Sequence, residues 1–343
     1  MKNGLKRAKP GKLLIQVLFL VVLSCSTEGD IQQVLGKSVE APVFVDCRPV
    51  SSTVLSFRFS TPVKVVSLDF DTAVEIDSVE DGREVKVTFT GPLGEGKKVT
   101  ADILVEDQDR NTLNVIVPFR TRNDRMPALV FNELRTENTK PKAEFVEFRT
   151  LAPGNLGAMR LFIAGHSLAK PAYEFPPAEV QAGEYIVLHL RTVEDGTADE
   201  TGDNLALSGG TDAQKDARDF WLPGNSKILH KTDALWLVDQ DDRIIDAILM
   251  SENLAEEWSA KDSKIASAAE YLGREKAWLP AAGEIPESAW FPKPAAALRT
   301  TGTTNTRTIC RDESIPASPK AGNWYITATS CATPGKPNNP KRY

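Results

Sequence analysis

The fold is decided by the stretch Leu129-Val-Phe-Asn-Glu-Leu134 and by Glu144-Phe-Val-Glu-Phe148, which begins ten residues later. In both stretches apolar and polar residues alternate with a period near two, which is typical of a strand that has one buried face. The connecting residues 135–142 are polar and include Pro141, as a hairpin connection does. We therefore expect two paired strands that open a larger β-domain.

Three acidic residues in these stretches, Glu133, Glu144 and Glu147, admit two interpretations. They could be paired carboxylates for acid–base chemistry, or they could point outward or bond to neighbouring backbone. Acid–base chemistry also needs a nucleophile or a metal partner, and no nearby motif supplies one. The sequence therefore favours the structural interpretation.

The same residues carry a family resemblance. Val130-Phe-Asn-Glu-Leu134 followed by Glu144-Phe-Val-Glu-Phe148 resembles the opening of the lamin-tail domain. The match continues in order through four segments: Gly154–Ile163 with Met159 near the place of the family's Trp, Phe175–Leu188, Ala234–Asp246 without the usual turn glycine, and Trp324 with Ala332-Thr-Pro-Gly-Lys-Pro-Asn338. The resemblance implies an immunoglobulin-like β-sandwich with long insertions over residues 128–340. It also implies tethering or adhesion, and it names no ligand.

The amino terminus predicts export. Five basic residues and no acidic residue precede the apolar run Leu13–Leu23, which is shorter than the ~20 residues that span a bilayer. The run ends in Val22-Leu-Ser-Cys25, which resembles the bacterial lipobox. The resemblance implies that residues 1–24 are a lipoprotein signal peptide, that Cys25 is acylated, and that residues 25–40 are a tether. A plain cleaved signal and an uncleaved amino-terminal helix stay open as alternatives.

Charge and hydropathy limit the partners of the exported chain. The formal net charge of −6 becomes −11 once the five positive charges of residues 1–24 are removed. Nucleic acid is then a poor partner, because phosphate binding needs clustered Lys and Arg. No second apolar run of membrane length follows. We expect a bacterial envelope protein, anchored by lipid to the inner or outer membrane, on a periplasmic or surface-exposed face.

Residues 41–123 predict a second β-domain. Leu55, Phe57 and Phe59 share one face of a strand, and several later segments alternate in the same way, with turn residues between them. Short strands at this spacing favour a β-sandwich. Phe57-Arg-Phe-Ser-Thr-Pro-Val63 and residues 105–113 resemble bacterial immunoglobulin-like repeats. The predicted fold class is therefore all-β: two tandem immunoglobulin-like β-sandwiches, the second with a short helical insertion.

The helical insertion is predicted at residues 253–278, where Leu254, Trp258, Ile265, Ala269 and Leu272 fall near helical spacing. We expect one or two short helices that end near Gly273. The residues Trp258, Trp278 and Trp290 are interpreted as packing anchors, with a tryptophan-lined sugar site as the alternative.

Three cysteines follow Cys25. Cys310 and Cys331 flank a predicted hairpin and could form a disulfide in an exported protein, or they could be two buried thiols. Cys47 is expected to be a lone buried thiol. Metal binding by three scattered cysteines is the least favoured reading of the pattern.

Several motifs suggest chemistry that their surroundings do not support. Gly165-His-Ser-Leu-Ala169 resembles a nucleophile elbow, but the nearby prolines, beginning with Pro171, exclude the helix that must follow Ser167. The histidines His166, His189 and His230 stand apart, and His189 is expected on the solvent face of its strand. Asp107, Asp109 and Asn111, whose side chains offer oxygen ligands, have calcium-loop spacing, without the Gly and Glu that complete such a loop, so a self-bonded turn is expected.

The long acidic loop Glu194–Asp219 is expected to be solvated and is a candidate interaction surface, with a Ca²⁺ site as the alternative. We predict no catalytic residue, no metal and no cofactor. The leading hypothesis is a non-enzymatic envelope lipoprotein with a structural, adhesion or protein-binding role, whose partner is a protein or a glycan. The alternatives are a carbohydrate- or Ca²⁺-binding surface module, and an accessory subunit of an exported hydrolase or nuclease.

Overall fold

The computed structural model describes residues 40–137, 140–253, 255–279, 293–300, 307–316 and 321–342. The predicted signal peptide, Cys25, nearly all of the predicted tether and Trp290 lie outside these residues. The chain divides into two compact units, of which the first comprises the described residues up to 48 with 54–90 and 100–119. The second comprises residues 49–53, 91–99 and those from 120 onward. Strands dominate both, so the predicted all-β class is confirmed.

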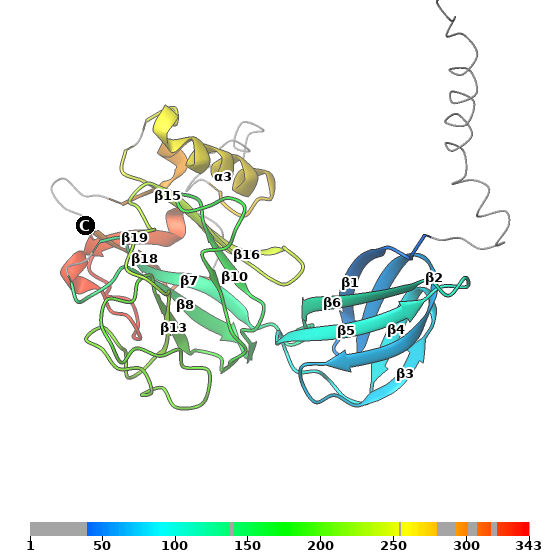
Figure 1. Ribbon diagram of the computed structural model, residues 1–343. Coiled ribbons are helices and arrows are strands. Elements are labelled where there is room, and N and C mark those ends of the chain that lie inside the picture. Colours follow the sequence, from blue (N-terminus) through cyan, green and yellow to red (C-terminus); the bar gives the residue numbers. More distant parts are fainter. Residues whose placement is uncertain are drawn as a thin grey trace, which may run out of the picture. The chain divides into compact units, whose positions relative to one another are not determined.

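The first unit contains a six-stranded arrangement (Figure 1). Its strands are β1 (Phe44–Ser51), β2 (Val54–Phe70), β3 (Ile76–Glu80), β4 (Gly82–Phe89), β5 (Lys98–Glu106) and β6 (Thr112–Arg120), in the order β3-β4-β2-β5-β6 with β1 also on β2. The first part of β2 pairs with β4, and the part from Lys64 to Phe70 pairs with β5. The predicted alternation is confirmed, because Leu55, Phe57 and Phe59 are buried.

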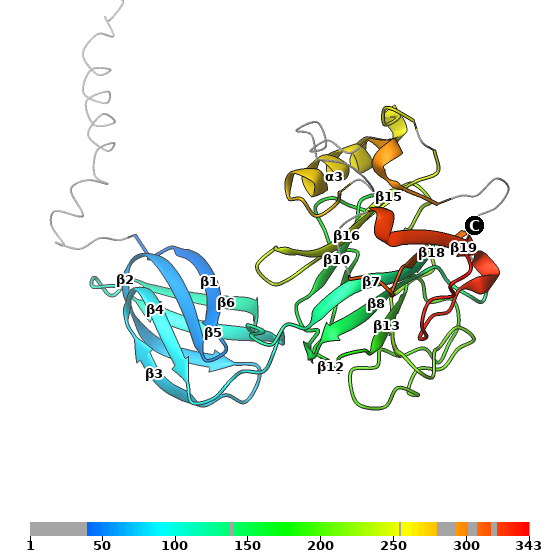
Figure 2. The same cartoon turned by 180° about the vertical axis from the view of Figure 1, so that it is seen from behind.

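The second unit holds two larger sheets. The first has the order β14-β13-β8-β7-β18-β19, built from β7 (Ala128–Arg135), β8 (Phe145–Ala152), β13 (Tyr185–His189), β14 (Arg218–Trp221), β18 (Arg307–Arg311) and β19 (Trp324–Ala328). The second has the order β11-β10-β15-β16-β17, built from β10 (Arg160–Ile163), β11 (Tyr173–Glu174), β15 (Asp233–Val238), β16 (Ile244–Ser251) and β17 (Leu298–Arg299). A short pair, β9 (Gly154–Asn155) and β12 (Glu179–Val180), lies apart from both and is visible in Figure 2.

The two stretches that opened the sequence analysis form β7 and β8, an antiparallel pair with Leu134 opposite Val146. Their apolar side chains enter one core that both sheets share, where Phe131 and Phe148 meet Leu161 and Leu235. Aromatic rings fill the centre of this core, and the Phe148 ring packs edge-on against Phe175. Edge-to-face pairs of this kind add about 0.5–1.5 kcal/mol beyond the burial of their area.

The predicted helical interruption is present as α3 (Ser263–Arg274), preceded by the 3₁₀ turn η2 (Ala260–Asp262). Ile265, Ala268, Ala269 and Leu272 are buried, which is the i, i+3, i+4, i+7 stripe of an amphipathic helix. The stripe lies against β15, at one end of the second sheet (Figures 1 and 2).

Irregular segments complete this part of the unit. The 3₁₀ turns η4 (Pro294–Ala296), η5 (Ala321–Asn323) and η6 (Thr329–Cys331) follow α3. Trp278 is fully buried and its indole N–H donates to the Ala296 carbonyl at 3.1 Å, as a packing anchor should. Trp258 is only partly buried and packs against the same core. In the part of the chain that the structure describes, no helix is long and apolar enough to cross a membrane.

Candidate binding groove and the buried carboxylates

The two acidic residues of the opening stretches, Glu133 and Glu147, are fully buried. Their carboxylates accept hydrogen bonds from backbone amides near the end of the chain: Glu133 from the Thr333 N–H at 3.0 and 3.1 Å, and Glu147 from the Gly335 N–H at 2.5 Å. The expectation that these acids point outward or bond to neighbouring backbone was wrong for Glu133 and Glu147, which are buried and bond to backbone that lies far away in sequence. Glu144 does not join them, because it pairs with Arg191.

A third glutamate, Glu313, completes this cluster. It accepts the Asn338 N–H at 3.1 Å and the side-chain amide of Asn132 at 3.0 Å. That amide also donates to Glu147 at 2.8 Å. We call residues 332–338 the C-terminal strap, because these bonds fix them across the sheet. The first and last segments of the lamin-tail resemblance thus meet in space, while Glu313 carried no sequence signal.

Burial favours the protonated form of two carboxyl groups in this cluster, those of Glu133 and Glu147. It raises the pKa of Glu133 to about 7, although the Thr333 amide opposes the shift. Burial also raises the pKa of Glu147 well above its ordinary value, and the neighbouring Glu133 charge adds to the rise. The Cys310 thiol donates to Glu133 at 3.8 Å, and burial raises the pKa of that thiol too. Cys310 is therefore a protonated donor rather than a nucleophile.

The structure has all three described cysteines as free thiols, in place of the predicted bridge between Cys310 and Cys331. The hairpin itself was predicted correctly, since β18 and β19 pair antiparallel. Their register places Tyr325 opposite Cys310, and Cys331 lies beyond the end of β19 in η6. Cys47 is half-buried rather than buried.

The acidic loop Glu194–Asp219 is ordered by its own carboxylates. Glu200 accepts the Asp219 N–H at 2.9 Å, and Asp219 accepts the Gln214 N–H at 2.6 Å. Asp219 also contacts His189 Nε2 at 2.9 Å. Within the described ranges, no group of three or more His, Cys, Asp or Glu side chains could hold a metal ion.

The expectation that His189 faces solvent was wrong. The side chain is buried, and its ring stacks on Trp221 with centroids 3.8 Å apart. The physical reason is that both faces of β13 are covered, since the four consecutive residues Ile186–His189 are all buried. His189 and Asp219 are part of the packing that holds the acidic loop.

Two turn motifs are closed by their own side chains, and the one at Asp107 was predicted. Asp107 accepts the N–H groups of Asp109 and Asn111, each at 2.9 Å, which is a self-bonded turn. The Ser167 hydroxyl oxygen accepts the N–H groups of Ala169 and Lys170 at 3.2 and 3.0 Å. Each side chain closes its own turn.

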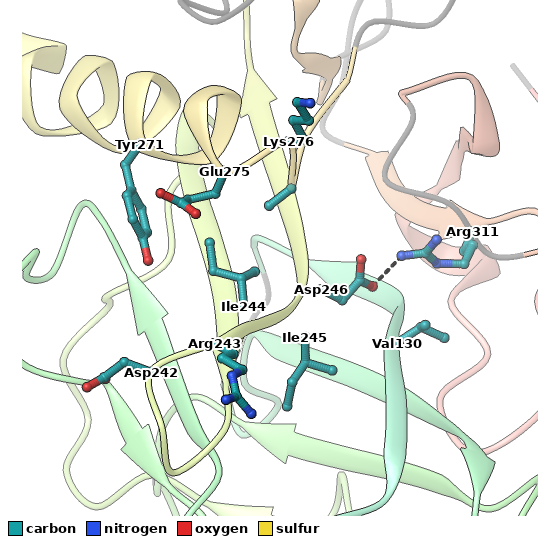
Figure 3. A pocket seen from close by; sticks show the side chains of 11 residues that line it. Val130, Asp242, Arg243, Ile244, Ile245, Asp246, Tyr271, Glu275, Lys276 and Arg311 are labelled. Carbon is teal, nitrogen blue, oxygen red and sulfur yellow. Dashed lines mark hydrogen bonds and ion pairs between the residues drawn. The ribbon is translucent and has the colours of Figure 1, made fainter.

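Two neighbouring cavities lie along α3. One of about 530 Å³ lies beside the carboxyl end of α3, β16 and the start of β7, and Figure 3 shows its lining side chains. The other, of about 360 Å³, is lined by Phe162, Leu168, Trp236 and Ala268. Both cavities are lined by Asp242 and Tyr271. We call the two together the α3 groove.

The two ends of the α3 groove differ in chemistry. At the apolar end the Phe162 and Trp236 rings are stacked, with centroids 5.1 Å apart and planes inclined by 6°. At the other end, Asp246 and Arg311 form a buried ion pair. The Glu275 carboxylate points into the cavity in Figure 3, beside Tyr271. Burial raises the pKa of Tyr271, and the negative charges of Glu275 and Asp242 raise it further.

An unusual turn places one of these acids. Asp242 stands in the β15–β16 hairpin at the position where the lamin-tail pattern has its turn glycine, and its φ of 62° is left-handed. A left-handed φ raises the conformational energy of an L-residue, and the increase is smaller for Asp than for most other residue types. The absence of the glycine was therefore a sign in the sequence of an unusual turn. The position of α3 in the structure shows that this turn borders the groove.

The chain resembles known proteins over its second unit. The family model described as "TP_1001_2nd: protein second domain" matches residues 127–326. An uncharacterised protein of Treponema pallidum (strain Nichols) is 26% identical over 207 residues, which are 58% of this chain and 52% of the relative. The chain thus spans about half the length of the curated relative that it matches.

Proposed function

The chain belongs to the TP_1001_2nd family through residues 127–326, and from this premise we propose that it is a lipid-anchored, non-enzymatic binding protein of the bacterial envelope. In this proposal Cys25 carries the lipid, residues 25–40 are the tether, and the two units are tandem immunoglobulin-like sandwiches. The second unit, with its lamin-tail resemblance, presents the α3 groove to a protein partner. The lipobox-like residues before Cys25 support the anchor, and the single core shared by two sheets supports the second sandwich.

The α3 groove is the observation that carries the proposed binding role. Ligand sites in proteins are concave and mostly apolar, with a few polar groups that fix orientation. The groove has this composition, with an apolar end at Phe162 and Leu168 and acidic groups at Glu275 and Asp242. Leu168 is 40% exposed at its rim. Leu168 also lines the apolar cavity, so the apolar wall of the groove continues to the surface of the protein.

A protein partner is favoured over a glycan by the state of the aromatic rings. Sugar sites expose an aromatic face on which a pyranose ring stacks. Here Trp236 is only 5% exposed and its stacking partner is Phe162. The apolar end of the groove therefore suits an inserted side chain better than a stacked sugar.

The buried carboxylates support a non-enzymatic role because their hydrogen-bonding capacity is already used. Burial raises the pKa of Asp233 to about 7, as it does for Glu133. Asp233 nevertheless accepts the backbone N–H groups of Gly165, His230 and Ala234. An acid bound to three amides of its own fold holds loops in place, whereas a catalytic acid must reach a substrate.

Site-specific photo-crosslinking in intact bacteria that express the protein tests the proposed binding role. A photoreactive residue replaces Leu168 at the rim of the groove, and in a matched variant it replaces Leu207, which is exposed in the acidic loop. We expect a covalent protein adduct from position 168 and none from position 207. Adducts from position 207 alone would show that the partner binds at the acidic loop and not at the groove. If neither position gave an adduct, the proposal would be overturned.

The anchor is tested separately. Cys25→Ser removes the sulfur that an acyl chain would need, so we expect palmitate labelling to disappear and the protein to leave the membrane fraction. Stable anchoring takes more than one acyl chain, each buried CH₂ adding about 0.8 kcal/mol. Unchanged membrane association of the Cys25→Ser variant would contradict the lipid anchor, and it would leave the proposed role of the groove unaffected.

A further inference from the structure

The backbone amides of the C-terminal strap bond to glutamate side chains and not to a neighbouring strand. Pro334 and Pro337 have no amide hydrogen, so from Thr333 to Asn338 only four backbone N–H groups can donate. Three of the four reach glutamate carboxyl groups, and the fourth, from Lys336, closes a turn within the strap. The protonation of these glutamates therefore acts directly on the bonds that hold the strap.

Two of the three glutamates face each other. Glu133 of β7 lies directly opposite Glu147 of β8 in the register of the antiparallel pair, and both side chains are fully buried. Directly opposite residues have Cβ atoms about 4.5–5.5 Å apart, and like charges in such a pair are destabilising. Burial removes the water that would screen them, so the closed strap favours a pair that retains at least one proton.

The two arginines beside this pair are each matched by another acid. Arg135 of β7 attracts the Glu133 charge, but it pairs with Asp212 of the acidic loop at 3.1 Å. Arg149 of β8 pairs with Glu313 at 3.4 Å. Glu313 itself adds a further negative charge beside the pair.

Neutral groups make up most of the remaining surroundings. Burial raises the pKa of the Cys310 thiol of β18 and of the Tyr185 and Tyr325 hydroxyls of β13 and β19, so all three stay protonated at neutral pH. The charged groups farther out are paired or exposed: Asp219 contacts His189, Arg342 pairs with Asp312, and Lys336 of the strap is exposed. In the described part of the chain, the second charge of an ionised pair thus meets no buried, unmatched cation.

The closed strap therefore binds more protons than an open one. Burial raises the pKa of Glu133 to about 7, and the pKa of Glu147 also rises well above its ordinary value. The advantage of the closed state is fully present below the ordinary glutamate pKa and is lost as the pH rises through about 7. Water reaches both carboxyl groups only when the amides of Thr333 and Gly335 move away from them.

From this geometry we propose that the C-terminal strap is a pH-controlled latch, closed while Glu133 and Glu147 retain a proton between them and released once both have lost their protons to water. Asn338 is the hinge of the latch. Its side-chain amide donates to the Asn132 and Arg311 carbonyls at 3.1 and 2.9 Å, and these acceptors do not titrate.

Release of the latch uncovers apolar surface on the first sheet. Ala332 of the strap packs against a small cluster formed by Phe145, Val187 and Ala217, which is separate from the main core. The latch uses no residue of the α3 groove, so it is a second device on the same unit.

Hydrogen–deuterium exchange of the full-length chain in detergent micelles tests the latch. Exchange is followed by mass spectrometry from pH 6 to pH 8, and dividing the intrinsic rate of an unprotected amide by each measured rate gives a protection factor. Peptides that contain the strap report local opening, and peptides from β16 in the main core report global unfolding. Global unfolding also frees the pair, so a latch is identified by a strap that exchanges faster than β16 at every pH.

We expect the protection of the strap to fall about tenfold between pH 6 and pH 8 as Glu133 ionises, with Glu147 adding to the fall. The double variant Glu133→Gln, Glu147→Gln keeps an acceptor oxygen at both positions and cannot ionise, so its strap protection should not change with pH. If the double variant does not fold, Glu133→Gln alone should show a smaller fall than the unchanged protein. Glu257→Gln, at an exposed position, should keep the full fall.

Three results would overturn the latch. A strap that exchanges no faster than β16 would open only by global unfolding. Constant strap protection between pH 6 and pH 8 would remove the pH control. An equal fall in the glutamine variants would assign the pH dependence to other groups.

Discussion

The buried glutamates that hold the C-terminal strap and the α3 groove both belong to the second unit. Their carboxylates have opposite roles. Glu133 and Glu147 are fully buried and accept amides of the C-terminal strap. Glu275 is exposed at the end of α3 and lines a cavity together with Lys276 and Arg243. A buried carboxylate must be satisfied by its own fold, because an unpaired buried charge is too costly. An exposed one beside an apolar cavity remains available to a partner.

The largest expected effect comes from deleting a strap carboxylate. Glu147→Ala leaves the Gly335 N–H without its acceptor, removes one of the two hydrogen bonds that the Asn132 amide donates, and opens space in the sheet. We expect a loss of about 2–4 kcal/mol in the free energy of unfolding, measured by urea denaturation. The matched change at exposed Glu257 should leave the midpoint unchanged. A loss below about 0.5 kcal/mol for Glu147→Ala would break the contrast between the two regions.

The second prediction concerns pH. Burial raises the pKa of Glu133 to about 7, so the folded state holds its proton more tightly than the unfolded chain does. Its contribution to stability is therefore fully present below the ordinary glutamate pKa and is lost as the pH rises through about 7. We expect the melting temperature to fall between pH 5 and pH 8, with an effect of about 1–3 kcal/mol. Glu133→Gln should flatten that slope, whereas Glu275→Gln should leave it unchanged, and equal slopes in all three would contradict the assignment.

The smallest effect is expected at Asp242, where a backbone cost and an ion pair oppose each other. Asp242→Gly removes the cost of the left-handed φ and also the exposed ion pair with Arg160, so we expect a net gain of about 0.5 kcal/mol in stability, measured as a higher melting temperature. Asp242→Asn is the control, since it removes the ion pair and keeps a side chain at the left-handed position. A glycine variant that melts below the asparagine variant would contradict the backbone cost at this turn.

Local patterns predicted the local structure well. The alternation in residues 129–134 and 144–148 predicted β7 and β8, and the spacing of Ile265, Ala269 and Leu272 predicted α3, which ends one residue beyond the expected Gly273. Such patterns act over a few residues, so the sequence alone reveals them. The strap differs, because the hydrogen bond between Glu147 and Gly335 joins residues 188 apart.

Contacts between distant segments account for the predictions that were wrong or missing. The burial of His189 depends on a parallel neighbour, β14, and on the loop that leads to it. The free thiols of Cys310 and Cys331 go with the register of the hairpin, which the sequence left open and which places Tyr325 opposite Cys310. The groove needs α3, the β15–β16 hairpin and the turn at Leu168 to come together, and no periodicity encodes that meeting. The missing turn glycine at Asp242 was its one local sign.

The strap also gives the second unit an order of assembly. β7 and β8 leave the ribosome long before residues 333–338, so their glutamates keep water as their partner until the final segment arrives. Contacts of such high sequence separation slow folding. The sheet is therefore complete only after the strap residues have been synthesised, so the second unit reaches its full stability last of all.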